Sequence, residues 1–170
     1  MGIAEVYARE LDAETPATKR VLERVPETHL AWRPHPKSMS LGQLALHVAT
    51  LPGQISEFLT GDALDFSAAA FGPPEATRRD ELLEAFAASL HRARVFLDGL
   101  TEARAAETWK LMAGDRQLFA APRGAVVRSL LFNHWYHHRG QLLVYLRLLD
   151  VPVPSVYGPT ADENPFAALV

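Results

Sequence analysis

Apolar residues recur at intervals of three and four positions along four stretches of the chain, as they do on one face of an amphipathic helix. The pattern predicts helices over residues 3–25, 40–60, 77–99 and 122–150. Pro16 interrupts the first helix and should either kink it or restart it with Thr15 as the N-cap. Pro52 lies inside the second and leaves the carbonyl of Val48 without its helical partner, so a kink just after His47 is expected.

The segments between these helices carry proline, glycine and other turn-forming residues. Residues 26–39 contain three prolines and are expected to be an irregular connector. Residues 61–76 read as a loop, and residues 108–121 are compatible with a short hairpin supported by the bundle. Residues 151–170 are predicted to be an irregular tail. The chain is therefore predicted to be a single all-α domain over residues 1–170, an antiparallel four-helix bundle with a small β-hairpin insert before the last helix.

Composition narrows the range of functions. The 170 residues are 48% hydrophobic and 22% charged, which is typical of one globular domain. The net charge of −3 offers no basic excess for a phosphate backbone, so no nucleic-acid partner is expected. No cysteine is present, which excludes disulfides, thiolate metal ligands and a cysteine nucleophile. Because the N-terminus lacks signal-peptide features and no run of about 18 apolar residues occurs, a cytoplasmic protein without membrane contact is expected.

The last predicted helix carries the most informative motif, from Asn133 to Gln141. At about 100° per residue, its inward stripe is formed by Val127, Leu131, Leu142, Tyr145 and Leu149. His134 and His138 lie on that stripe, roughly 40° apart, while His137 falls about 60° to the other side of His134. Two imidazoles four positions apart on one helix can bind a single metal ion. A zincin-type protease is not supported, because Trp135 stands where that motif has glutamate.

His47 is the candidate for a third metal ligand. It lies between Leu44 and Leu51 at the edge of the apolar stripe of the second predicted helix. Metal sites in helical bundles are built from side chains on facing helices, so His47 could meet the histidine pair across the core. The alternative is that these histidines are structural. A buried pair without a metal would need two separate polar partners, and the residues alone leave both readings open.

Three motifs carry a resemblance to a known family. They are Trp32-Arg33-Pro34 followed by Lys37 to Leu44 and His47; Asn133-His134 followed by His137 to Leu142 and Tyr145-Leu146-Arg147; and Pro152-Val153-Pro154 followed by Tyr157 to Glu163. With them the sequence resembles the DinB/YfiT-like superfamily. The resemblance implies a four-helix bundle, a homodimer, and one divalent metal ion, nickel or zinc, held by three histidines that match His47, His134 and His138. It also implies open metal positions filled by water, and it does not imply DNA binding.

The resemblance also suggests an activity. Some relatives join a low-molecular-weight thiol, such as bacillithiol or mycothiol, to an electrophile, and many others have no assigned activity. The leading hypothesis is a metal-dependent transferase that activates such a thiol for reaction with a small-molecule substrate. A second hypothesis is a metal-dependent hydrolase that uses metal-bound hydroxide, for which Asp162 or Glu163 would supply a base if the tail folds over the site. A third is a non-catalytic metal-binding bundle with a role in stress response.

Further residues are expected near the site. Loops 61–76 and 108–121 are expected to form the surface that sets substrate specificity. Candidate contacts of the metal ligands or of a substrate are His137, Arg139, Gln141 and Tyr157.

Overall fold

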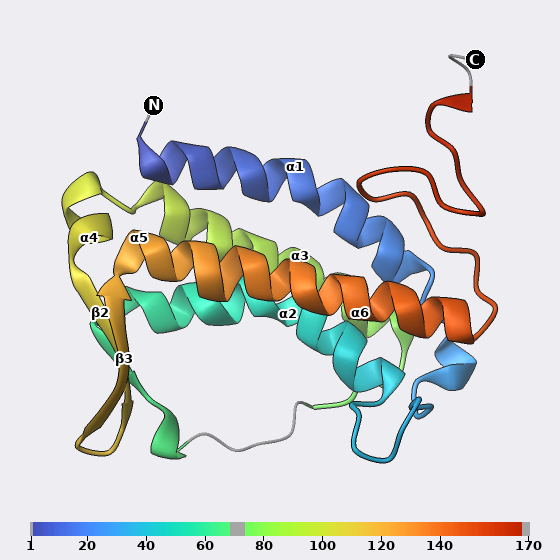
Figure 1. The fold of residues 1–170 in the computed structure, drawn as a ribbon, viewed down its shortest axis with the longest axis horizontal. Coiled ribbons are helices and arrows are strands. Elements are labelled where there is room, and N and C mark those ends of the chain that lie inside the picture. The colour runs from blue at the N-terminus through green and yellow to red at the C-terminus, as the bar shows by residue number, and fades with distance from the viewer. Residues whose placement is uncertain (1, 69–73, 168–170) are drawn as a thin grey trace.

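A computed structural model describes residues 2–68 and 74–167, and its long helices pack side by side as a bundle (Figure 1). The helices of the bundle are α1 (Ile3–Glu23), α2 (Leu41–Thr60), α3 (Arg79–Asp98), and a last stretch made of α5 (Arg123–Val126), a π-helix (Val127–Asn133) and α6 (His134–Leu148). The predicted four-helix bundle is confirmed. No helix among the described residues is both long and apolar enough to cross a membrane.

The direction of the helices depends on one long connection. Helix α1 is antiparallel to α3, and α2 is antiparallel to α6 (Figure 1). Helices α2 and α3, however, run in the same direction, because the chain after α2 returns along the bundle before α3 begins (Figure 1). The contacts between the two helices confirm this direction, because the residue numbers rise together on both. Gly53 contacts Ser89, and one turn later Glu57 contacts Arg92.

Both helix-interior prolines are accommodated without a break. Helix α1 continues through Pro16, so the expectation that Thr15 restarts the helix as an N-cap is wrong. The Thr15 hydroxyl instead donates to the carbonyl of Leu11, 2.7 Å away, one turn earlier in the same helix. Helix α2 changes direction midway along its length, as Pro52 predicted (Figure 1). Its start is fixed by Ser40, whose side chain accepts from the backbone N–H of the third helical residue in a capping box.

The predicted hairpin forms and gains a third strand. Strands β2 (Thr108–Ala113) and β3 (Arg116–Pro122) are antiparallel, and β1 (Ala63–Asp65) pairs parallel with β2. The prediction of residues 61–76 as a loop is therefore wrong at β1 and at the short 3-10 helix Phe66–Ala68 that follows it. A three-residue strand carries too little periodicity to be recognised, and only pairing with β2 satisfies its backbone. Residues 69–73 of that loop lie outside the described residues.

A buried arginine fastens this sheet to the bundle. Arg123, which is 0% exposed, follows β3 directly and donates to the carbonyls of Leu59 and Gly61 at the end of α2. It also pairs with Asp62 at 2.9 Å, just before β1. Carbonyls at a helix end lack helical donors, so a guanidinium there supplies the hydrogen bonds that the helix itself cannot. Arg123 therefore joins the end of α2 to the sheet.

Between α3 and the sheet, the chain forms one further short helix, α4 (Glu102–Ala106).

The π-helix changes which residues of the last helix face the core. The sequence predicted one regular helix over 122–150 with Tyr145 and Leu149 inward, but both are only half-buried. Trp135 and Leu146, at 0% exposure, take the inward positions instead. A π-helix places more residues in each turn than an α-helix, so the turns that follow it are rotated relative to the α-helical pattern. The rotation moves His134 and His138 from the centre of the inward face to its edge, beside α2.

Candidate metal centre

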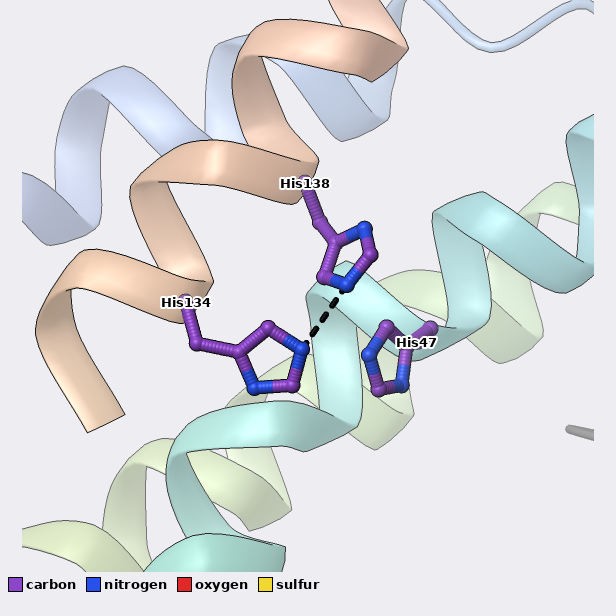
Figure 2. A group of neighbouring side chains, drawn as sticks. All are labelled: His47, His134 and His138. Carbon is purple, nitrogen blue, oxygen red and sulfur yellow. Dashed lines mark hydrogen bonds between the residues drawn. The ribbon is translucent and has the colours of Figure 1, made fainter. Parts of the chain in front are cut away.

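Three imidazoles meet where α6 crosses α2, with His47 on α2 and His134 and His138 on successive turns of α6 (Figure 2). One ring nitrogen from each of the three lies within 4.8 Å of the others. The Nε2 atoms of His134 and His138 are 2.8 Å apart. The ring centre of His47 lies 4.5 Å from that of His138. The fold thus brings together the three residues that the sequence nominated as ligands.

The crossing is held by a hydrogen bond next to the histidines. Pro52 cannot donate to the carbonyl of Val48, and the indole Nε1 of Trp135 donates to that carbonyl instead, at 3.0 Å. Val48 follows His47 directly, and Trp135 follows His134 directly. One bond between buried groups therefore fixes the two helices at the residues adjoining two candidate ligands. The sequence did not identify Trp135 as this donor, although the unpaired Val48 carbonyl was a signal that a donor must lie nearby.

Hydrogen bonds also set which nitrogens carry protons. The Nδ1 of His138 lies 2.8 Å from Oε1 of Gln141, and since this oxygen only accepts, Nδ1 carries the proton. His134 bonds to the backbone of Leu130, and because its Nε2 faces His138, the nitrogen that donates there is Nδ1. The two Nε2 atoms face each other at hydrogen-bond distance (Figure 2). Because Nδ1 of each ring bonds outward, Nε2 is the nitrogen that each ring can offer to a metal ion.

The electrostatics keep these imidazoles neutral. Burial is the main cause that lowers the pKa of all three histidines. For His47, burial together with the nearby His138 and His134 lowers the pKa to about 4. A neutral imidazole is the form that binds a metal ion. Imidazole nitrogens bind divalent metals at roughly 2.0–2.1 Å, so one ion can touch two nitrogens that are 2.8 Å apart. The three residues therefore fit a divalent metal ion.

Two cavities open onto the histidines from opposite sides. The first, of about 350 Å³, lies between α2, the π-helix and the sheet and reaches His47 and His134. The second, of about 470 Å³, is a more open groove along α6 that includes His138, Gln141 and Lys37. Three protein ligands with space on both sides are typical of a catalytic metal site rather than a closed structural one.

The segments predicted to set specificity do reach the first cavity. Leu64 and Phe66 come from the region predicted as loop 61–76, and Trp109 and Leu111 come from the hairpin region 108–121. No pattern in the sequence indicated that β1 would pair with β2, and this pairing brings the two segments together.

The other predicted contact residues divide into two groups. Gln141 bonds to His138, and the ring of the exposed His137 packs edge-to-face against that of His138, with centres 4.9 Å apart. Arg139 and Tyr157 bond to each other away from the histidines, at the side of α6 that faces α1. There Arg139, which is 2% exposed, pairs with Glu14 at 2.7 Å.

The two tail carboxylates are engaged elsewhere. Asp162 pairs with Arg147 and accepts from the backbone N–H of Val153 at 2.8 Å. Glu163 pairs with Arg20 and accepts from the backbone N–H of Ser155 at 3.0 Å. The cluster at the crossing consists of three histidines and contains no carboxylate from the described residues.

Comparison with known proteins agrees with this architecture. The sequence profile of the DinB family matches residues 2–165. The chain is 27% identical over 161 residues to the uncharacterized protein YrdA of Bacillus subtilis (strain 168), covering 92% of this chain and 89% of YrdA.

Two crystal structures share the fold. A DinB-like protein from Bacillus cereus ATCC 10987 superposes with a TM-score of 0.70 at 23% identity, covering 90% of this chain and 97% of that one. The DinB-like protein YjoA from Bacillus subtilis gives a TM-score of 0.65 at 19% identity, covering 88% and 95%. The helical bundle, the histidine cluster and the family profile lead to one conclusion: the chain belongs to the DinB family.

Proposed function

We propose that this protein is a metal-dependent transferase that activates a low-molecular-weight thiol for attack on an electrophilic small molecule. The observation that carries the proposal is the convergence of three imidazoles, two of them with Nε2 atoms 2.8 Å apart, at a point open to two cavities. His47, His134 and His138 would hold the ion. Nickel and zinc both suit imidazole ligands.

The chain has no cysteine, so any thiol at this site must come from outside the protein. A bound divalent ion supplies Lewis acidity, which lowers the pKa of a coordinated thiol and makes the sulfur nucleophilic at neutral pH. In the transfer, the thiol releases its proton to solvent, its sulfur forms a bond to the electrophilic carbon, and the leaving group departs with the electron pair of its bond. Gln141 fixes the ring of His138, and the Trp135 bond to Val48 keeps both helices in place.

The hydrolase alternative has less support. A hydrolase needs a general base near the ion, and the tail carboxylates that could have served are paired with Arg147 and Arg20. The third hypothesis, a metal-binding bundle without turnover, differs from the first in its predicted activity and not in its site.

The metal site is tested by metal analysis of protein purified without a histidine tag. We expect close to one ion per chain in the wild type and a large loss in His134→Ala. His91→Ala, which removes an exposed histidine on α3, is the matched control and should retain the metal. Equal metal content in His134→Ala and the wild type would refute the site.

The activity is tested with the metal-loaded protein, a panel of thiols and 1-chloro-2,4-dinitrobenzene as the electrophile. We expect at least one thiol to react faster than it does with the same concentration of free metal, and the acceleration to be lost in His134→Ala. If no thiol is accelerated while the metal is bound, the non-catalytic hypothesis is favoured. Hydrolysis of esters or amides without thiol would favour the hydrolase.

A further inference from the structure

The cavity of about 350 Å³ beside His47 and His134 differs from ordinary surface hollows in its chemistry. Nine of its twelve lining residues are apolar, and none of these described residues is Asp, Glu, Lys or Arg, so a charged group inside it would have no counter-ion. Its volume falls within the ~300–1,000 Å³ of small-molecule sites. Its polar groups are the two histidines and Gln54.

The sheet supplies one wall of this cavity. Leu64 of β1 pairs with Leu111 of β2, and partners in adjacent strands share one face of a sheet. Trp109, two positions before Leu111, lies on that same face, and its Nε1 donates to the carbonyl of Phe58 on α2 at 3.2 Å. The wall is thus tied to the helix that carries His47.

The rim of the cavity exposes large apolar groups. Phe58 is 41% exposed and Phe66 is 38% exposed, and both line the cavity. Apolar surface is favourably removed from water, and exposed aromatic groups around a concave site are typical of a ligand-binding region.

We infer that this cavity binds the apolar part of the electrophilic substrate, a neutral aromatic or branched alkyl group whose reactive carbon lies at the histidine end. This inference rests on the proposed function for the role of the bound molecule. The opposite groove, which contains Lys37 and is open to solvent, remains for the thiol. The reactive carbon and the thiol would then approach the three histidines from opposite sides.

Binding is tested on the metal-free protein, so that the result does not depend on turnover. The probes are 2-naphthamide and 2-naphthoate, which match in shape and differ in charge, and binding is followed by methyl NMR of the isoleucine and leucine side chains. We expect the neutral amide to bind and to shift the methyl signals of Ile55 and Leu111. The carboxylate should bind more than about tenfold more weakly, because its charge has no partner in the cavity.

Three variants locate the binding site. Leu111→Trp and Leu64→Trp each fill the cavity from a different strand, so the test survives if one of them fails to fold. Both should weaken amide binding by at least about tenfold. The matched control is Leu118→Trp: Leu118 lies on β3, is 46% exposed and does not line the cavity.

The outcomes separate this inference from the proposed function. Amide binding that is lost in the two cavity variants and kept in Leu118→Trp supports the cavity, whether or not thiol transfer is found. Equal binding of amide and carboxylate, or unchanged amide binding in a folded cavity variant, would overturn the inference. Thiol transfer could still be intact in that case, which would leave the proposed function standing.

Discussion

The two sides of α6 differ in how their polar side chains are paired. On the side that faces α1, Tyr136 donates to Glu10 at 2.6 Å and Arg139 pairs with Glu14 at 2.7 Å, so buried polar groups meet partners of complementary charge. On the side that faces α2, His134 and His138 point their Nε2 atoms at each other, 2.8 Å apart. The first arrangement is complete within the chain and stabilises the fold. The second gathers imidazoles whose lowered pKa values keep them in the neutral form that binds a metal ion.

The difference also appears in how each side responds to burial. Burial and the bond to Glu10 raise the pKa of Tyr136, so the phenol stays protonated and continues to donate. Burial lowers the pKa of the histidines, so they stay unprotonated and able to accept a metal ion. The same desolvation therefore strengthens a structural contact on one side and prepares a ligand set on the other.

The largest effect is expected from breaking the α1 side. Arg139→Ala leaves Glu14 largely buried without its cation, which should lower the free energy of unfolding by about 3–5 kcal/mol, measured by urea denaturation. The control is Arg147→Ala, where the solvent-screened pair with Asp162 should contribute little to the free energy of unfolding. The metal affinity of folded Arg139→Ala should stay close to that of the wild type. If Arg139→Ala instead lost metal affinity with unchanged stability, the α1 side would serve the metal site and not the stability of the fold.

The bond between Trp135 and Val48 couples the helices at the site. Trp135→Phe removes the donor and leaves a buried carbonyl unpaired, which should lower the free energy of unfolding by about 1–3 kcal/mol and weaken metal binding. Pro52→Ala restores a backbone N–H that can donate to Val48 within α2. The loss caused by Trp135→Phe should therefore be smaller in the Pro52→Ala background, as measured by a double-mutant cycle. If the changes in the free energy of unfolding caused by the two substitutions simply add, the bond from Trp135 to Val48 does not contribute to stability.

On the α2 side, the neighbours of His138 should differ sharply in importance. Gln141→Ala removes the acceptor that orients His138, and loss of such an outer partner typically weakens metal binding by about 10–100-fold. His137→Ala removes an exposed ring that packs only edge-to-face against His138, and it should change metal affinity little. Titration calorimetry with zinc compares the two variants. Equal affinities would show that the hydrogen bond from His138 to Gln141 does not prepare the ligand.

The smallest expected effect is that of mild acid on metal binding. An imidazole of ordinary pKa near 6.5 would lose about 30-fold in affinity at pH 5 through competition with protons. Because the pKa of His47 is about 4, that residue should lose almost nothing at pH 5, and the lowered pKa values of His134 and His138 act in the same direction. Zinc titrations between pH 7 and pH 4 test this, and release centred on pH 6.5 would contradict it.

The free energy of unfolding of the metal-free protein should also depend on pH, because the pKa of His47 is lowered in the folded chain. The unfolded chain binds more protons at position 47 than the folded chain between pH about 6.5 and about 4. This contribution to stability is therefore present above pH 6.5 and is lost as the pH falls through that window.

The sequence by itself determined the features that depend on neighbours within a few turns. These include the four helices, the placement of His134 and His138 on one helix face, and the unpaired carbonyl that Pro52 leaves at Val48. Each follows from helical geometry, which relates residues three or four positions apart. The family motifs supported His47 as the third ligand, but helical periodicity could not place it beside the other two.

Only the tertiary structure decided which distant groups complete these features. Trp135 reaches Val48 across 87 positions, and Arg139 reaches Thr18 across 121. The parallel pairing of Leu64 with Leu111 forms the apolar cavity, and the π-helix turns His134 and His138 to the edge of the core. Such contacts depend on how the chain returns on itself and on a local change of helical pitch. Neither produces a periodic pattern of residues in the sequence, because each is determined by the burial and hydrogen bonding of the whole fold.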